Sequence, residues 1–184
     1  MTKKVKIGST PQEVCLREPR ESDFQELQCL FAASRKLLRG FASTNFDRKL
    51  FNEMLAASRL ETTEAFLICL RDSGAIVGQI TLSQIFRKSF RSAYLGYQLF
   101  NGFTGNGYMT EAVRLLLRKA FTDLDLHRVE ANVQPENKAS IAVLKRNGFS
   151  KEGFSRRYLK IGGRWRDHER WAIIKEDWRS LQRK

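Results

Sequence analysis

The chain has 184 residues and a mass of 21.3 kDa, and 42% of its residues are hydrophobic, which predicts one compact domain over residues 1–184. It contains no uninterrupted run of about 18 apolar residues, and its start, MTKKVKIGST, is not followed by an apolar stretch of signal-peptide length. Three cysteines form no CxxC pair, which argues against a metal site. We therefore expect a soluble cytoplasmic protein.

Charge is the unusual part of the composition. Lysine and arginine number 33 against 20 acidic residues, so the formal net charge is +13 and the pI is about 10.1. This excess predicts attraction to polyanions, among them nucleic acid, ribosomes and phosphorylated cofactors. A solvated basic surface without such a partner is the alternative interpretation. The basic residues recur in short patches at 87–91, 145–146 and 156–166.

Hydrophobic periodicity and turn residues divide the chain into short elements. In chain order they predict a strand at 14–17, a helix ending at Gly40, a helix from Asp47 towards Leu60, a hairpin of strands at 66–70 and 75–85, a strand at 92–100, a helix at 110–124, a strand at 127–134, a helix at 136–147, and strands at 148–160 and 164–174. Ser22 and Gln25 have the spacing of a capping box before the first helix. The order predicts an α/β fold in which a sheet is layered with helices.

The sequence FNGFTGNGYMTEAV, residues 100–113, places three glycines between a predicted strand and a predicted helix. Such a loop lets backbone N–H groups surround a phosphate, with the positive end of the helix behind them. A dinucleotide fingerprint starting at Gly105 would need a third glycine where Thr110 stands, and a P-loop would need lysine after Gly107, where Tyr108 stands. Both nucleotide interpretations are therefore weakened, and two alternatives remain for the loop taken alone: a phosphate-bearing ligand of another kind, or a plain turn.

The loop does not stand alone. The motifs GxGYMTEA, HRVEANV and PENKASIAVLKRNGF follow one another, and with them the chain resembles the GNAT acetyltransferase superfamily over a core of about 14–178. The resemblance implies a mixed, mostly antiparallel central sheet flanked by helices, with a splayed strand pair that forms the acetyl-CoA cleft. In that family the loop and helix bind the pyrophosphate, and pantetheine lies in the cleft. The cofactor-binding residues implied are Leu99, Phe100, Gly105, Asn106, Gly107, Tyr108, Met109, Thr110 and Asn137.

One position departs from the family pattern. The common motif places glutamine or arginine three residues before its first glycine, and this chain has Gly102 there. Within the superfamily the sequence is most similar to the ribosomal-protein alanine N-acetyltransferase branch, because of AYLGYQL before the loop, NVQPENKASIAVLKRNGF after it, and the tail EGFSRRYLKIGGRWRDHERWAI. That likeness implies direct transfer of acetyl to the N-terminal α-amine of a ribosomal protein.

The resemblance also suggests where the chemistry takes place. Asn137 matches an asparagine that hydrogen-bonds pantetheine, and Ser140, one helical turn further on, would lie near the thioester sulfur. We expect Ser140 to be the partner or proton donor of the departing thiolate. Many family members use a tyrosine instead, five residues before the phenylalanine of the GF pair, but this chain has Leu144 there.

No strong general base stands at the expected place, since many relatives have glutamate where this chain has Tyr94. Tyr94 is thus the second candidate catalytic residue, with a water relay, Glu130 and His168 as alternatives; for His168 we expect a structural pairing with Asp167. The acceptor decides how much help is needed, because an α-amine with a pKa of about 7.7–8.0 loses its proton about 3.4 kcal/mol more easily than lysine at about 10.4. The missing base favours an N-terminal amine.

Two other functions remain open from the sequence. The acceptor could be a small amine such as a polyamine, an amino acid or an aminoglycoside, although residues 1–64 show no acidic cluster suited to a polycation. A non-catalytic module that binds CoA or RNA and keeps the GNAT shape is the other alternative. The positive charge leads us to expect association with ribosomes or their RNA.

Overall fold

The computed structural model describes residues 14–42 and 45–183. The start of the chain, on which the expectation of no export signal rests, lies outside these residues. Among the helices described, none is long and apolar enough to cross a membrane. The elements are β1 (Val14–Arg17), η1 (Glu21–Asp23), α1 (Phe24–Leu38), α2 (Arg48–Ala57), β2 (Glu64–Leu70), β3 (Ile76–Phe86), β4 (Ser92–Leu99), α3 (Tyr108–Thr122), β5 (Arg128–Val133), α4 (Lys138–Arg146), β6 (Ser150–Ile161), β7 (Arg164–Ile174) and α5 (Lys175–Leu181).

The predicted order of strands and helices is confirmed, with differences at the ends of elements. Helix α3 begins at Tyr108 rather than Thr110, and α5 was not predicted because its seven residues carry too short an apolar pattern. The capping box expected from Ser22 and Gln25 is wrong. The side chain of Asp23 instead accepts the backbone N–H of Arg20 at 2.7 Å, which stabilises a short 3-10 turn before α1.

A seven-stranded sheet in the order β1-β2-β3-β4-β5-β7-β6 runs through the molecule, and its only parallel pair among the described residues is β4 with β5. In this pair, residues Ser92–Tyr94 of β4 are hydrogen-bonded to residues Arg128–Glu130 of β5, and the pairing ends there. Beyond that point β4 stays with β3 and β5 stays with β7, so the sheet divides into two halves. The splayed strand pair that the family resemblance implies is therefore present. A bulge lies in β3, where Gln84 has φ 50°.

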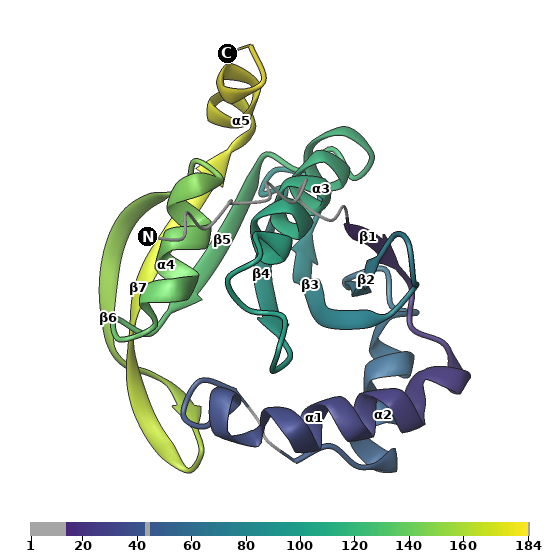
Figure 1. Cartoon of the computed structure of the whole chain (residues 1–184). Coiled ribbons are helices and arrows are strands. Elements are labelled where there is room, and N and C mark those ends of the chain that lie inside the picture. Colours follow the sequence, from purple (N-terminus) through teal and green to yellow (C-terminus); the bar gives the residue numbers. More distant parts are fainter. Residues whose placement is uncertain (1–13, 43–44, 184) are drawn as a thin grey trace, which may run out of the picture.

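Buried apolar side chains form two clusters, one on each face of the sheet, and Figure 1 shows the helices that pack over them. Helices α3 and α4 pack on one face, where the predicted stripe of α3 from Met109 to Phe121 is buried against strands such as β4 and β5. Helices α1 and α2 pack on the other face against β2 and β3, with Phe31 and Phe51 among the buried side chains. Alternate residues of each strand face these two layers because successive strand side chains point to opposite faces.

Two hydrogen bonds join α1 and the residues just after it to the segments that surround the splayed strands. The hydroxyl of Ser34, which is fully buried, accepts the backbone N–H of Asn101 at 2.8 Å at the start of the glycine loop. The side-chain amide of Gln134, which follows β5, donates to the carbonyl of Gly40 at 2.7 Å. These contacts hold the end of α1 and the adjoining residues Phe41 and Ala42 beside the gap between β4 and β5.

Candidate active site

The glycine loop has the backbone conformation of an anion-binding turn. Gly105 and Gly107 adopt φ 85° and 82°, a left-handed region that glycine enters at little cost. A Cβ atom at either position would meet no other atom within 4 Å, so the space above the loop is open to a ligand. Asn106, between them, is exposed. The loop is thus open to close approach, and its contact with a cofactor stays a prediction.

Helix α3 begins directly after Gly107, and its first intrahelical bond runs from the N–H of Glu111 to the carbonyl of Gly107 at 3.1 Å. The N–H groups of the preceding first turn point away from the helix body, and the helix dipole places partial positive charge there. The side chains of Tyr108 and Met109 are buried in the core, so this turn offers a ligand its main chain, together with the half-buried Thr110. This arrangement suits a pyrophosphate.

The strand end before the loop is less accessible. Phe100 is fully buried under α1 and α2, and its N–H donates to the carbonyl of Val77 at 2.9 Å. Leu99 is half-buried and pairs with Gly78 in β3. Neither residue is among those that line the cleft described next. Their contact with a cofactor stays a prediction.

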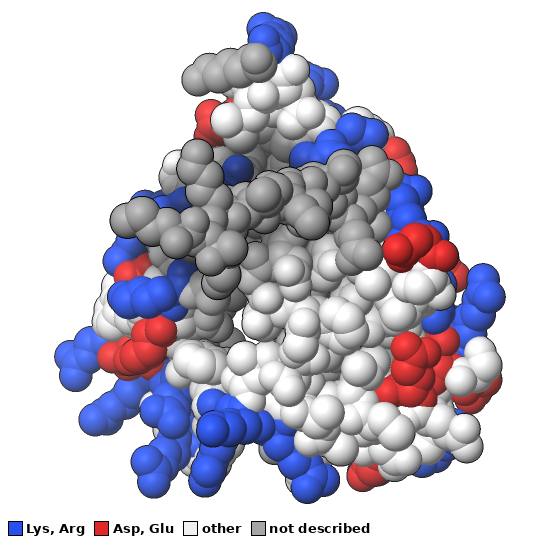
Figure 2. Space-filling view, viewed as in Figure 1, with Lys and Arg blue, Asp and Glu red and all other residues white. Residues whose placement is uncertain are grey.

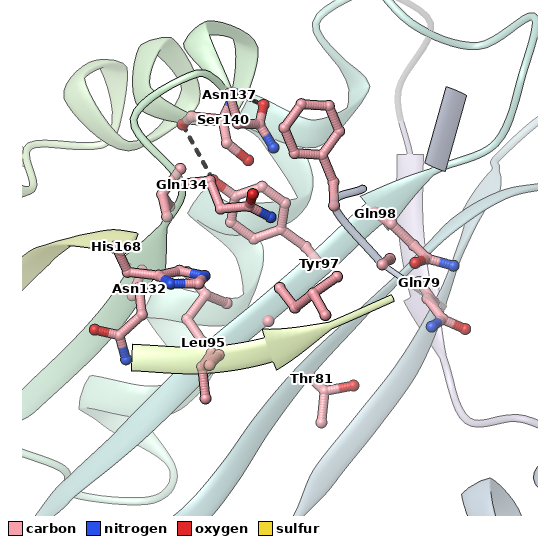
Figure 3. A pocket seen from close by; sticks show the side chains of 17 residues that line it. Gln79, Thr81, Leu95, Tyr97, Gln98, Asn132, Gln134, Asn137, Ser140 and His168 are labelled. Atoms are coloured by element: carbon pink, nitrogen blue, oxygen red, sulfur yellow. Dashed lines mark hydrogen bonds between the residues drawn. The ribbon is translucent and has the colours of Figure 1, made fainter. Parts of the chain in front are cut away.

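A cleft of about 350 Å³ opens where β4 and β5 separate (Figure 3). Its polar walls come from strands and helices far apart in the sequence. They comprise Gln79, Thr81, Tyr97, Gln98, Asn132, Gln134, Asn137, Ser140 and His168, with Phe41, Leu95, Leu159 and Ile161 among the apolar lining residues. Of the lining residues that the structure describes, none is an aspartate, glutamate, lysine or arginine.

Asn137 and Ser140, which the sequence analysis selected, lie together at one end of the cleft (Figure 3). Asn137 caps α4, since its Oδ1 accepts the backbone N–H of Ser140 at 3.1 Å. Beside them lies Tyr97, which sequence reasoning did not select; its hydroxyl donates to the carbonyl of Ser140 at 3.2 Å. Burial raises the pKa of Tyr97 to about 12, so its hydroxyl keeps its proton at physiological pH. The sequence signal that could have identified Tyr97 is a tyrosine near the end of the strand that leads into the glycine loop.

Tyr94, the predicted candidate base, lies elsewhere. It occupies the last paired position of β4, opposite Glu130 of β5, and does not line the cleft. Burial, with Glu130 adding to it, raises the pKa of Tyr94, which makes this hydroxyl a weaker acid. Glu130 is held by Arg128, whose Nε lies 2.8 Å from Glu130 Oε1. The structure therefore does not bring Tyr94 or Glu130 together with Ser140 at the cleft, and their catalytic role stays a prediction.

His168 does reach the cleft, although we expected it to pair with Asp167. That pairing is wrong: Asp167 Oδ1 accepts the backbone N–H of Arg157 at 2.7 Å, and His168 Nδ1 lies 3.1 Å from the carbonyl oxygen of Arg166. A carbonyl can only accept, so in the neutral ring Nδ1 carries the hydrogen and Nε2 keeps a lone pair. His168 is 2% exposed, and its ring forms part of the cleft wall (Figure 3).

Three buried side-chain atoms at the cleft have no hydrogen-bond partner within the described part of the chain. They are Gln79 Oε1, Gln98 Nε2 and Asn132 Oδ1. A buried polar atom left without a partner costs roughly 1–3 kcal/mol, and few occur in native proteins. At the edge of a cleft, ordered water or a bound molecule can supply the missing hydrogen bonds of such atoms. The sequence carries no signal for them, because glutamine and asparagine on a strand are equally compatible with a solvated face.

The site fits a phosphate-bearing cofactor with an elongated arm. Main-chain groups from Gly105 to Thr110 would hold its phosphates, and the cleft between β4 and β5, with the side chain of Asn137, would hold the arm. Among residues 14–42 and 45–183, no group of three or more His, Cys, Asp or Glu side chains is placed to hold a metal ion.

Comparison with known proteins agrees with this geometry. Residues 13–150 match the family described as "Acetyltransferase (GNAT) domain". The chain belongs to the GNAT acetyltransferase family, whose neighbours include structures with CoA bound, and the mixed sheet with its splayed strands is the fold of that family. Acetyl-CoA is accordingly the co-substrate that the loop and cleft suit.

Individual relatives indicate to which branch of the GNAT family the chain is similar. "Probable N-acetyltransferase YjcK" of Bacillus subtilis is 44% identical over 121 residues, which span 65% of this chain and 67% of that protein. "[Ribosomal protein uS5]-alanine N-acetyltransferase" of Escherichia coli is 40% identical over 107 residues, 58% of this chain and 55% of that protein. The structure of "Mycobacterium smegmatis RimJ in complex with CoA-disulfide" superimposes with a TM-score of 0.81 at 35% identity, covering 89% of this chain and 82% of that one. The family resemblance, including its ribosomal-protein branch, is confirmed.

Proposed function

We propose that this protein transfers acetyl from acetyl-CoA directly to the N-terminal α-amine of a protein, and that its acceptor is a ribosomal protein in the cytoplasm. The observation that carries the proposal is the lining of the cleft, which is neutral throughout its described residues and includes His168, Asn132 and Ser140 (Figure 3). The similarity to a ribosomal-protein alanine N-acetyltransferase supports the choice of acceptor.

The neutral lining speaks against a polycationic acceptor. A polyamine carries several ammonium groups, and each needs a carboxylate or several oxygens to replace its water. Basic side chains adjoin the cleft instead: the exposed Arg164 is paired with the lining residue Ile161, and the half-buried Arg166 is paired with Leu159. A single α-amine, which is on the order of one tenth neutral at pH 7, can enter such a cleft without its charge.

The proposed roles of the chain's own residues follow from their positions. Asn132 Oδ1 accepts one hydrogen of the incoming amine, and His168 Nε2, which keeps a lone pair, removes its proton. When bound, acetyl-CoA supplies an acetyl group activated as a thioester. Ser140 Oγ, on the side of the reacting carbon where the sulfur leaves, would stabilise the departing thiolate with a hydrogen bond, and the proton that His168 takes from the amine balances the one that the thiolate gains from solvent. The Tyr97 hydroxyl fixes the position of Ser140 through its carbonyl.

The deciding experiment measures thiol release from acetyl-CoA with three acceptor pools. These are short peptides with free Ala or Ser N termini, the same peptides blocked at the N terminus but containing lysine, and a panel of small amines. The proposal expects release only with free N termini. Release confined to small amines would assign the protein to metabolite acetylation, and CoA binding without release would favour a non-catalytic module.

We propose ribosomal RNA as the partner of the basic surface. Figure 2 shows a group of Lys and Arg side chains on one part of the surface. In the same view, Figure 1 shows the tip of the β6–β7 hairpin and the end of α1 at this place. On this hairpin Arg156, Arg157, Lys160 and Arg164 are exposed, and the ring of Trp165 is 60% exposed. Arginines bind phosphates while an exposed aromatic ring stacks on an unpaired base, so the hairpin combines the two elements of a single-stranded RNA surface.

Ribosome association is tested by sedimentation with ribosomes at increasing salt. The double variant Arg156→Gln/Lys160→Gln is expected to dissociate at lower salt, because each lost phosphate contact removes roughly 0.7 from the slope of log affinity against log salt. Arg179→Gln/Arg183→Gln changes the net charge equally on exposed residues at or next to α5, away from the hairpin, and serves as the control. Equal losses in both variants would show a general charge effect and no hairpin site.

A further inference from the structure

A second cavity adjoins the transfer cleft on the side of α1 and α2. It has a volume of about 250 Å³ and is lined by Phe31, Phe46, Leu50, Met54, Gln79 and Gln98. The two glutamines also line the cleft, so they form the boundary between the two spaces. None of the roles described above uses this cavity.

The glutamines form a matched pair. Gln79 of β3 lies directly opposite Gln98 of β4 in the antiparallel ladder, so their side chains leave the sheet on the same face about 5 Å apart. Gln79 Oε1 is a buried acceptor and Gln98 Nε2 a buried donor, and neither has a partner within the described residues. One residue of an extended peptide presents its N–H and C=O on the same side, as in a sheet ladder. The pair is therefore complementary to the main chain of a peptide.

The rest of the second cavity is apolar and held in shape by stacked rings. Phe46 packs parallel to Phe31, with ring centroids 4.2 Å apart and an interplanar angle of 5°. Leu50 and Met54 of α2 complete the walls. Apolar cavities of roughly 150 Å³ hold a benzene-sized group, so this one has room for a large apolar side chain.

We propose that the Gln79–Gln98 pair binds the main chain of the acceptor peptide and that the cavity receives the side chain of the acceptor's second residue. This inference rests on the proposed function. With the α-amine in the cleft, the first residue is next to the transfer point, and the following residue is the first whose side chain can pass the glutamine pair. The enzyme then prefers acceptors whose second residue is a large apolar one such as leucine or methionine.

The first test compares kcat/KM for three peptides that begin Ala-Leu, Ala-Gly and Ala-Lys and are otherwise identical. Ala-Leu is expected to exceed both others by roughly tenfold or more. Met54→Glu, at a half-buried position of α2, places a carboxylate in the cavity and is expected to shift the preference towards Ala-Lys. The control Asn52→Glu adds the same charge on the exposed side of α2 and should leave the preference unchanged.

The second test separates binding from folding. The double variant Gln79→Met/Gln98→Met keeps the side-chain volume and removes two unpartnered buried polar atoms, so its thermal midpoint should be unchanged or higher. Its KM for the Ala-Leu peptide should rise about tenfold while the Kd for CoA stays the same. A structural role for the glutamines would lower the midpoint instead.

The outcomes distinguish the inference from the function on which it rests. If all three peptides are acetylated at equal rates, the proposed function stands and the side-chain cavity is refuted. If the glutamine variant acetylates Ala-Leu as well as the parent does, the main-chain contact is refuted. If no peptide is acetylated, both the proposed function and the inference fail.

Discussion

Asn137 caps α4, we propose that it also binds the cofactor, and one pair of substitutions distinguishes the observed role from the proposed one. Its Oδ1 caps α4 by accepting the N–H of Ser140 at 3.1 Å, and its side-chain NH₂ is the group that would donate to the cofactor arm. Replacing Asn137 with alanine removes both functions. Replacing it with aspartate keeps a cap of equal quality and removes the donor.

The magnitudes follow from these two hydrogen bonds. Loss of an asparagine cap costs about 1 kcal/mol, which lowers the thermal midpoint of a chain of this size by about 2–4 °C. Loss of one neutral hydrogen bond to the cofactor costs about 0.5–1.5 kcal/mol, or roughly two- to tenfold in Kd. Asn137→Ala should therefore show both losses, and Asn137→Asp only the loss of affinity.

Differential scanning calorimetry without ligand measures the cap, and isothermal titration with CoA measures the contact. An Asn137→Asp variant that binds CoA with the affinity of the parent would refute the assignment of this side chain to the cofactor. A thermal midpoint that falls equally in both variants would refute the cap as the origin of the stability change.

Three further predictions concern single side chains. Tyr97→Phe loses the hydrogen bond to Ser140 and should lower kcat by up to about tenfold. The loss should be equal from pH 6 to 9, because burial raises the pKa of Tyr97 to about 12, and steady-state pH profiles measure it. His168→Gln should lower kcat by about 10²-fold at pH 7, with a deficit that shrinks towards pH 9, where an α-amine is already neutral; a constant deficit would remove His168 as the base. Burial opposes ionisation of Asp23, but the hydrogen bonds from Arg17 hold the pKa of this carboxyl below its usual value. That stabilisation is present at neutral pH and is lost as the pH falls below about 4, so urea unfolding of Asp23→Asn should show a loss of about 2 kcal/mol at pH 7 that disappears in acid.

Much of the fold could be predicted from the sequence because local patterns determine local structure. The apolar stripe of α3, the hairpin turn at 162–163 and the glycines of the loop were all recognisable, since each depends on spacing or on φ within a few residues. Helix α4 was placed for the same reason, with Asn137 at its start. The capping box at Ser22 and Gln25 failed because the turn before α1 begins earlier, at Arg20, where Asp23, anchored by Arg17, accepts the backbone N–H of Arg20.

The site depended on information that no local pattern contains. Sequence spacing placed Asn137 and Ser140 on one helical turn, but it could not show that Tyr97, some forty residues earlier, reaches the carbonyl of Ser140. The same applies to His168, which shares the cleft with these residues only because β7 pairs with β5. Tyr94 was selected by its place in the strand, but it lies in the segment of β4 that is still paired with β5, before the two strands separate.

The sequence by itself therefore determined the succession of elements, the glycine loop before α3 and the family, because hydrophobic period, glycine positions and motif order are properties of neighbouring residues. Only the tertiary structure decided where β4 leaves β5, which face His168 presents, and that Gln79 and Gln98 stand opposite each other between two cavities. The physical reason is that register and splay between strands are set by pairing and packing between distant segments, and a one-residue shift in register would send each of these side chains to the other face of the sheet.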